Sequence, residues 1–202
     1  IQFIENKGQW EDKIRFKGSF PGGAIFIQRN GFTILQHHPD DYKKLVDRVH
    51  GHQLDPHARQ ASQGDSLTIR SHAYEAQFIG ANTHATIIAD KPIVTYNNYF
   101  IGNDPSKWAV GCKIYQGITI QNLYPNVDLR YYSNNGLMKY DLVVKPGGNV
   151  GQIALQYKGV EKLSVKNKEL IVGTSVGQVK ELYPYTYQYN AKGKQEVPCK
   201  YI

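Results

Sequence analysis

The chain has 202 residues, of which 41% are hydrophobic, 12% aromatic and 20% charged. These proportions are typical of a folded protein with a sizeable core and exclude an intrinsically disordered chain. No apolar run approaches the ~18 residues that a membrane-spanning helix requires, so we expect no membrane insertion. The length fits one domain over residues 1–202.

Basic residues outnumber acidic ones, 24 to 17, which gives a formal net charge of +7. They are scattered along the chain rather than gathered into the stripe that nucleic-acid binding requires. The densest run contains Lys162, Lys166 and Lys168, alternates with apolar residues and indicates a solvated strand face. Nucleic acid is therefore not an expected partner.

A hairpin is the first clear element of the chain. Residues 24–28 and 32–36 are rich in β-branched and aromatic side chains, which favours strands. Between them Asn30 and Gly31 predict a type I′ turn, because that turn needs positive φ at both central residues.

One helix is predicted, over residues 40–49. Asp40 is placed to cap it, with Pro39 just upstream. Apolar residues recur there at helical spacing: Tyr42, Leu45, Val46 and Val49. The polar segment that follows, residues 50–64, reads as a long loop, and any break between two lobes is expected near residues 50–65.

Short strands account for the rest of the chain. They are separated by Gly- and Asn-bearing turns, notably at residues 134–136 and 191–194. The chain is therefore predicted to be all-β: an antiparallel β-sandwich with at most one or two short helices. The remaining predicted strands are residues 66–70, 72–78, 86–88, 93–101, 114–120, 127–133, 137–145, 153–157, 163–166, 169–174, 178–181, 185–190 and 196–202.

Histidines are frequent in the polar segment. His50, His52 and His57, with Asp55, could surround a zinc ion, but their spacing matches no established zinc pattern. The plainer interpretation is a set of exposed loop histidines, and we assign no metal ligand and no cofactor.

Catalytic patterns are equally weak. The chain lacks a G-x-S-x-G nucleophile motif, and the acidic pairs Asp40-Asp41 and Glu11-Asp12 have no reason to converge on a sugar. No catalytic residue is assigned, and the chain is not expected to be an enzyme.

The two cysteines, Cys112 and Cys199, do not form a C-x-x-C pair, so a zinc ribbon or thioredoxin-type motif is excluded. They would pair in an oxidising compartment only if their Cα atoms came within ~7 Å, which the sequence does not decide. Lys113 could lower the pKa of the Cys112 thiol, whereas the plainer expectation is a half-buried thiol on a strand edge.

Tyrosine is the most abundant aromatic residue, with 15 copies. Eight of them could form a stacking platform for glycans or a protein partner, but most of these eight alternate along strands, so about half of the eight should belong to the core. The tyrosines considered are Tyr96, Tyr99, Tyr131, Tyr132, Tyr183, Tyr185, Tyr187 and Tyr189.

Six sequence motifs of the chain are similar to motifs of one protein family. They are FIENKGQW (3–10), PGGA (21–24), NYFIGNDPSKW (98–108), NLYPNVDL (122–129), KYDL (139–142) and TSVG (174–177). Together they resemble the N-terminal domain of large secreted surface proteins of the Bacteroidota. In that family this domain precedes β-propeller-type (SBBP) repeats and a C-terminal sorting domain of the gliding-motility type.

The resemblance implies export, with the signal peptide removed and the type 9 system as the route, and an extracellular or outer-surface location. It also implies that the chain is an N-terminal fragment of a longer polypeptide, with the following domains among its partners. It supplies no catalytic residue. The motifs also fit structural roles, with Trp10 and Trp108 expected as core anchors beside turns and an Asp104-Pro105 turn between strands.

We therefore expect a non-catalytic module of a secreted cell-surface protein, used for adhesion or assembly through other extracellular proteins or glycans. Two alternatives remain open at this point. One is a carbohydrate-active enzyme or its accessory domain, which would need two converging carboxylates. The other is a metal-binding module that uses His50, His52 and His57.

Overall fold

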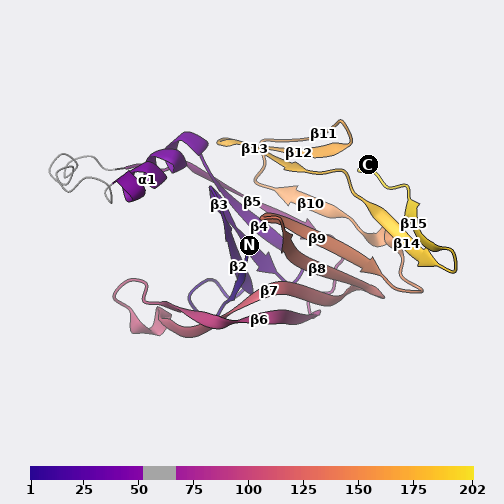
Figure 1. Ribbon diagram of the computed structural model, residues 1–202, viewed down its shortest axis with the longest axis horizontal. Coiled ribbons are helices and arrows are strands. Elements are labelled where there is room, and N and C mark those ends of the chain that lie inside the picture. Colours follow the sequence, from indigo (N-terminus) through magenta and orange to yellow (C-terminus); the bar gives the residue numbers. More distant parts are fainter. Residues whose placement is uncertain (52–66) are drawn as a thin grey trace. The chain divides into compact units, whose positions relative to one another are not determined.

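The computed structural model describes residues 1–51 and 67–202 (Figure 1). Within these residues the chain is almost wholly β, with one α-helix, α1 (Pro39–Gly51), and two short 3-10 helices, η2 (Pro105–Lys107) and η3 (Val150–Gln152). The strands are β1 (Phe3–Glu5), β2 (Phe16–Phe20), β3 (Gly23–Gln28), β4 (Gly31–His37), β5 (Ser71–Phe78), β6 (Thr86–Tyr99), β7 (Ala109–Tyr124), β8 (Val127–Asn134), β9 (Leu137–Val144), β10 (Leu155–Lys158), β11 (Lys162–Lys166), β12 (Glu169–Thr174), β13 (Gly177–Glu181), β14 (Thr186–Asn190) and β15 (Gly193–Val197).

The chain divides into two compact units, each built from two separate segments. The first unit contains Ile1–Gln36 and Ala73–Lys158, and the second contains His37–His72 and Gly159–Ile202. The lobe break predicted near residues 50–65 lies almost wholly outside the described residues.

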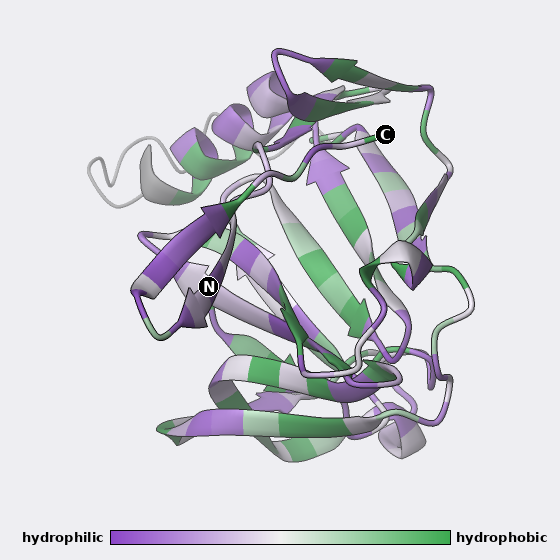
Figure 2. Cartoon of the chain, turned by 90° about the vertical axis from the view of Figure 1, so that its right-hand side faces the viewer, coloured by the Kyte–Doolittle hydropathy of each residue, from purple (hydrophilic) through white to green (hydrophobic). Residues whose placement is uncertain are grey.

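One ten-stranded sheet makes up the first unit. Its strand order is β10-β5-β4-β3-β2-β1-β7-β8-β9, with β6 also paired to β7. The long strand β7 pairs with β1 at Ile114 and Tyr115 and with β8 from Gly117 onward, while β6 runs antiparallel along it. The expected antiparallel all-β fold is confirmed, and alternate residues along many strands differ in hydropathy (Figure 2).

The sheet curls so that distant strands share one interior. The Phe32 ring of β4 packs against Tyr131 of β8 and Tyr140 of β9, with ring centroids 6.2 Å apart in both cases. In the flat sheet, β4 and β8 would lie ~24 Å apart, five strand spacings. The largest side chains that this core buries completely include Phe3, Ile25, Ile27, Phe78, Ile118, Ile120, Leu123, Leu129 and Tyr131.

The first hairpin is confirmed, but its predicted turn is wrong by one residue. Gln28 pairs with Gly31, so Arg29 and Asn30 form the turn, and none of the three residues from Arg29 to Gly31 has positive φ. Gly31 is instead required by close approach, since a Cβ there would overlap the carbonyl oxygen of Ala76 in β5. The missing side chain lets β4 and β5 pair at this point.

The second predicted hairpin, β8–β9, has the expected turn. Asn134 pairs with Leu137, and the two residues between them, Asn135 and Gly136, have φ of 51° and 76°. Both therefore occupy the left-handed region that a type I′ turn requires.

The second unit contains α1, the sheet β11-β12-β13 and the hairpin β14–β15. Helix α1 begins at Pro39, a residue earlier than predicted, so Asp40 lies in its first turn and not at the cap. The neighbouring Asp41 is buried, and its carboxylate accepts hydrogen bonds from the Arg70 guanidinium at 2.8 and 2.9 Å and from the Arg70 backbone N–H at 3.1 Å. This contact ties α1 to the residues just before β5.

None of the helices in the described ranges is long and apolar enough to cross a membrane.

Candidate functional site

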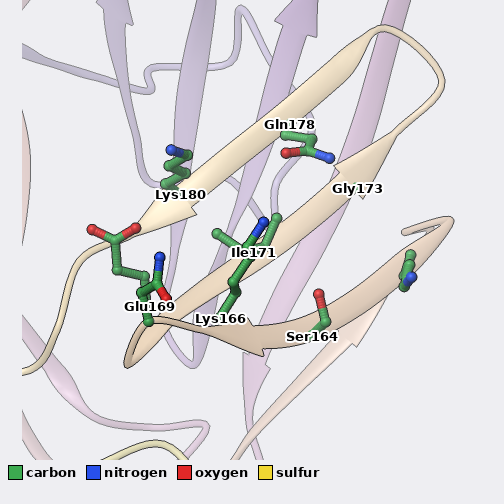
Figure 3. A pocket seen from close by; sticks show the side chains of 9 residues that line it. Ser164, Lys166, Glu169, Ile171, Gly173, Gln178 and Lys180 are labelled. Carbon is green, nitrogen blue, oxygen red and sulfur yellow. The ribbon is translucent and has the colours of Figure 1, made fainter.

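A groove lined by lysines crosses one face of the sheet β11-β12-β13 (Figure 3). It encloses about 350 Å³ and draws residues from all three strands and from the β11–β12 turn. We call it the lysine groove, and its lining consists of Lys162, Ser164, Lys166, Asn167, Glu169, Ile171, Gly173, Gln178 and Lys180.

Strand alternation explains why these residues share a face. Leu163 pairs with Val172 and Val165 with Leu170, which places the apolar residues of β11 and β12 together on the opposite face. Leu170 and Val172 are buried there. The residues between them along each strand point to the groove side, so the packed face is the one that carries Leu170 and Val172, although Leu163 and Val165 of β11 remain exposed there.

Gly173 creates the hollow at the centre of the groove. It pairs with Lys162 on one side and Gln178 on the other. A Cβ at this position would lie 3.3 Å from the Lys162 Cβ, which is a tight contact. Gly173 and Ile171 therefore form a floor between the longer side chains of the outer strands, as Figure 3 shows.

The groove carries a positive charge. Three ammonium groups, on Lys162, Lys166 and Lys180, face one carboxylate, Glu169, which leaves a net charge of 3 − 1 = +2. Within the described part of the chain, none of these three lysines lies within 4.0 Å of a carboxylate oxygen. The ammonium groups are therefore available to an external anion.

The lining offers one carboxylate and several neutral hydrogen-bonding groups. Glycoside hydrolysis commonly needs two carboxyl groups facing the scissile bond, and the groove offers only Glu169. Ser164, Asn167 and Gln178 add hydroxyl and amide groups that can donate or accept hydrogen bonds. The sequence correctly indicated a solvated strand face for Lys162 and Lys166, whereas Lys168, the third lysine of that run, lies in the β11–β12 turn. It missed the groove because Lys180 and Gln178 come from another strand.

A tyrosine ladder is the second exposed surface of this unit. Tyr185, Tyr187 and Tyr189 follow one another on the same face, with neighbouring centroids 5.6 and 5.7 Å apart. Lys194 places its Nζ 4.9 Å from the Tyr185 centroid and 3.9 Å from that of Tyr187. The three rings are 58%, 45% and 74% exposed, in that order.

The other tyrosines of the predicted platform are dispersed. Tyr131 is the only one of the eight that is buried, so the expectation that about half belong to the core is wrong. Tyr99 and Tyr132 are half-buried, and Tyr96 and Tyr183 are exposed.

The first motif, FIENKGQW, forms a hydrogen-bonded loop after β1. The Asn6 side chain donates to the carbonyl oxygens of Trp10, Glu11 and Ile14 at 2.8–3.1 Å and accepts from the Gly8 and Trp10 backbone N–H groups. The motif is therefore explained by the architecture of the first unit.

The buried Gln9 extends this network. Its Nε2 donates to the Glu5 carbonyl oxygen at 2.8 Å and lies 3.4 Å from the Cys112 Sγ. Its Oε1 accepts from the Lys7 backbone N–H. The loop is thereby fixed to both β1 and β7.

The two tryptophans are not both core anchors. Trp10 is half-buried and packs edge-on against Tyr99, with centroids 5.3 Å apart. Trp108 is 43% exposed, contradicting the prediction, and packs edge-on against Phe100 while its Nε1 donates to the Gly102 carbonyl oxygen. The predicted turn beside it is confirmed, with Asp104 accepting from the Ser106 backbone N–H at 3.0 Å.

Cys112 is a buried thiol in this fold. It is fully buried rather than half-buried, and burial raises the pKa of its thiol, the opposite of the activation by Lys113 that the sequence allowed. Cys199 is half-buried, and both cysteines are free thiols.

The structure places one residue of each acidic pair in an ion pair, whereas most of the candidate zinc ligands lie outside the described residues. Asp41 is bound by Arg70, and Glu11 forms a surface pair with Lys13 at 3.7 Å. His52, Asp55 and His57 lie outside the described residues, as does the side chain of His50. Among the residues that are described, no three His, Cys, Asp or Glu side chains gather to hold a metal ion.

His72 has a structural position that the sequence did not suggest. Its Nε2 lies 2.6 Å from the Gly159 carbonyl oxygen and its Nδ1 lies 2.9 Å from the Ser175 hydroxyl. The Ser175 backbone N–H also approaches Nδ1, at 3.2 Å. The TSVG motif, which contains Ser175 in the β12–β13 turn, is therefore hydrogen-bonded to His72, a residue of the same unit.

Comparison with known proteins gives a family without a described activity. No curated protein and no solved structure matches the chain. Residues 3–202 match the family model described as "Domain of unknown function (DUF7948)", so the chain belongs to this family.

Proposed function

We propose that the chain is a non-catalytic binding module of a secreted cell-surface protein, which serves adhesion or assembly through contacts with extracellular proteins or glycans. The lysine groove carries this proposal. It is a preformed, positively charged hollow whose amines have no carboxylate partner within salt-bridge distance in the described residues. Such a surface attracts anionic partners and steers their approach.

The tyrosine ladder supports the same proposal. Exposed tyrosines combine a large apolar ring with a polar hydroxyl, and they are enriched at protein interfaces. Tyr187 and Tyr189 stand on a two-stranded hairpin, and Tyr185 directly precedes it. Such a hairpin is at most marginally stable alone in water. A partner that covers the ladder would stabilise the hairpin.

The proposed location and export route rest on the six sequence motifs. Their resemblance to N-terminal domains of secreted Bacteroidota surface proteins favours an outer-surface location, export by the type 9 system and assembly with following domains of the same polypeptide. An enzymatic role has less support, because the groove offers only one carboxylate.

A binding panel tests the proposal. The purified chain is passed over arrays of extracellular glycans and over surface proteins, and retention at physiological salt is compared with that of the triple variant K162Q/K166Q/K180Q. A control variant, K139Q/K192Q/K200Q, removes the same charge from exposed lysines elsewhere.

We expect retention of the wild type and the control, and loss of retention in the groove variant. Absence of any retained glycan or protein would contradict the proposed function. Equal losses in both variants would show that net charge acts, and not the groove.

A further inference from the structure

The spacing of the lysines in the groove limits the shape of its ligand. Lys162 and Lys166 are four residues apart on one face of β11, which separates their Cα atoms by ~13 Å. Lys180 lies on β13, two strands away, at ~10 Å. A single small anion would contact all three amines only if the exposed lysine side chains bent toward one point, whereas an extended chain with repeated negative charges meets them as they are spaced.

The uncharged residues of the groove indicate what kind of group the ligand carries between its negative charges. The floor is formed by Gly173 and Ile171, which leave an apolar strip, and Ser164 and Gln178 flank it with a hydroxyl and an amide. A sugar ring presents C–H groups on its faces and hydroxyls at its edge. This combination therefore fits a saccharide that also bears acidic groups.

Other polyanions fit the groove less well. Its lining contains no aromatic residue on which nucleic-acid bases could stack. An acidic peptide recognised by strand addition would need a free strand edge. The outer edges of β11 and β13 have no strand partner in the described residues, but the groove lies across the face of the sheet, over β12, which is paired on both sides.

We propose that the lysine groove binds an acidic polysaccharide, a chain whose sugar residues carry carboxylate groups. Lys162, Lys166 and Lys180 contact successive carboxylates, and the Gly173–Ile171 floor supports the sugar ring between them. This inference rests on the proposed function and names the ligand class of the same groove.

Calorimetric titration of the full chain with a defined uronic-acid oligosaccharide tests the inference. The methyl ester of the same oligosaccharide, a poly-glutamate peptide and single-stranded DNA of similar length serve as comparison ligands. We expect the free oligosaccharide to bind, and each comparison ligand to bind at least ~10-fold more weakly.

Two variants test the groove itself. K166Q/K180Q should weaken binding by ~10-fold or more. It should also reduce the slope of log affinity against log salt concentration by the amount expected for about two lost charge contacts. G173L fills the hollow without changing the charge and should weaken binding to a similar extent. K139Q/K192Q is the charge-matched control, and thermal unfolding confirms that each variant remains folded.

The possible outcomes separate the inference from the proposed function. Equal binding of poly-glutamate or DNA would overturn the saccharide class, and equal binding of the methyl ester would overturn the role of carboxylate. Wild-type affinity in G173L would overturn the groove as the site. If the oligosaccharide fails to bind while K162Q/K166Q/K180Q still abolishes retention on the panel, the ligand class is wrong and the proposed function stands. If neither experiment detects binding, both fail.

Discussion

Phe32 in β4 and Tyr131 in β8 meet edge-on, with ring centroids 6.2 Å apart, although four strands separate β4 from β8 in the order of the sheet. Both rings are almost completely buried. The contact joins the two arms of the sheet that diverge from the long strand β7. The curl of the first unit is therefore stabilised by aromatic packing between its arms.

Replacing Phe32 with alanine should open this contact. Loss of a buried phenylalanine typically costs about 3–5 kcal/mol, from the lost transfer free energy and the cavity left behind. We expect a decrease of that size in the free energy of unfolding, measured by urea denaturation. Phe100→Ala is the matched control, because Phe100 is 62% exposed and its removal should change stability by much less. Equal effects of the two substitutions would show that the arms do not depend on Phe32.

Gly31→Ala tests the close approach of β4 and β5. The new Cβ would overlap the Ala76 carbonyl oxygen, so the strands must separate, and we expect a loss of about 1–3 kcal/mol. Gly151→Ala is the control, since its Cβ would meet only the Asn149 side chain, at 3.2 Å, and should cost less than ~0.5 kcal/mol. Wild-type stability of Gly31→Ala in the same denaturation experiment would refute this explanation.

These two glycines show how far local sequence determines the fold. Asn135-Gly136 is correctly interpreted from sequence, because a type I′ turn depends only on the φ of two adjacent residues. Asn30-Gly31 is the same dipeptide, but its glycine is required for a different reason. Gly31 is needed because its backbone lies against the carbonyl oxygen of Ala76, a residue 45 positions away in the sequence. No local sequence pattern predicts such a contact.

The candidate site has the same mixture of local and distant causes. Alternation alone predicted the solvated face of β11, since Lys162 and Lys166 are an even number of residues apart. The hollow depends on pairing Gly173 beside Lys162, and its charge depends on Lys180 from β13. Two-residue turns, Asn167-Lys168 and Ser175-Val176, set the register of these strands, and neither turn was identified from the sequence.

Thiol reactivity distinguishes the environments of the two cysteines. Cys112 is fully buried and its pKa is raised, whereas Cys199 is half-buried. With a disulfide reagent that reports free thiols, we expect one fast equivalent from the native protein and a second that reacts only as the protein unfolds. Cys199→Ser should remove the fast phase, and Cys112→Ser the slow one. A fast phase that survives in Cys199→Ser would contradict the burial of Cys112.

The ion pair between Asp41 and Arg70 should make the second unit sensitive to acid. Hydrogen bonds from the Arg70 side chain and backbone hold the pKa of Asp41 well below its ordinary value. In acid the unfolded state therefore binds more protons than the folded state, and stability falls as the pH falls. The contribution of the pair is complete above the ordinary pKa of aspartate, ~3.9, and is lost progressively as the pH is lowered from there toward the folded-state value.

A double-mutant cycle measures this dependence. The free energies of unfolding of the wild type, Asp41→Asn, Arg70→Gln and the double variant are compared between pH 6 and pH 2. We expect a favourable coupling between the two positions at pH 6 that shrinks steadily below pH ~4. The single variants should also lose part of the acid slope of the wild type, because the carboxylate that resists protonation is either absent or unpaired. A coupling that stays constant down to pH 2 would show that the Asp41 charge does not stabilise the contact.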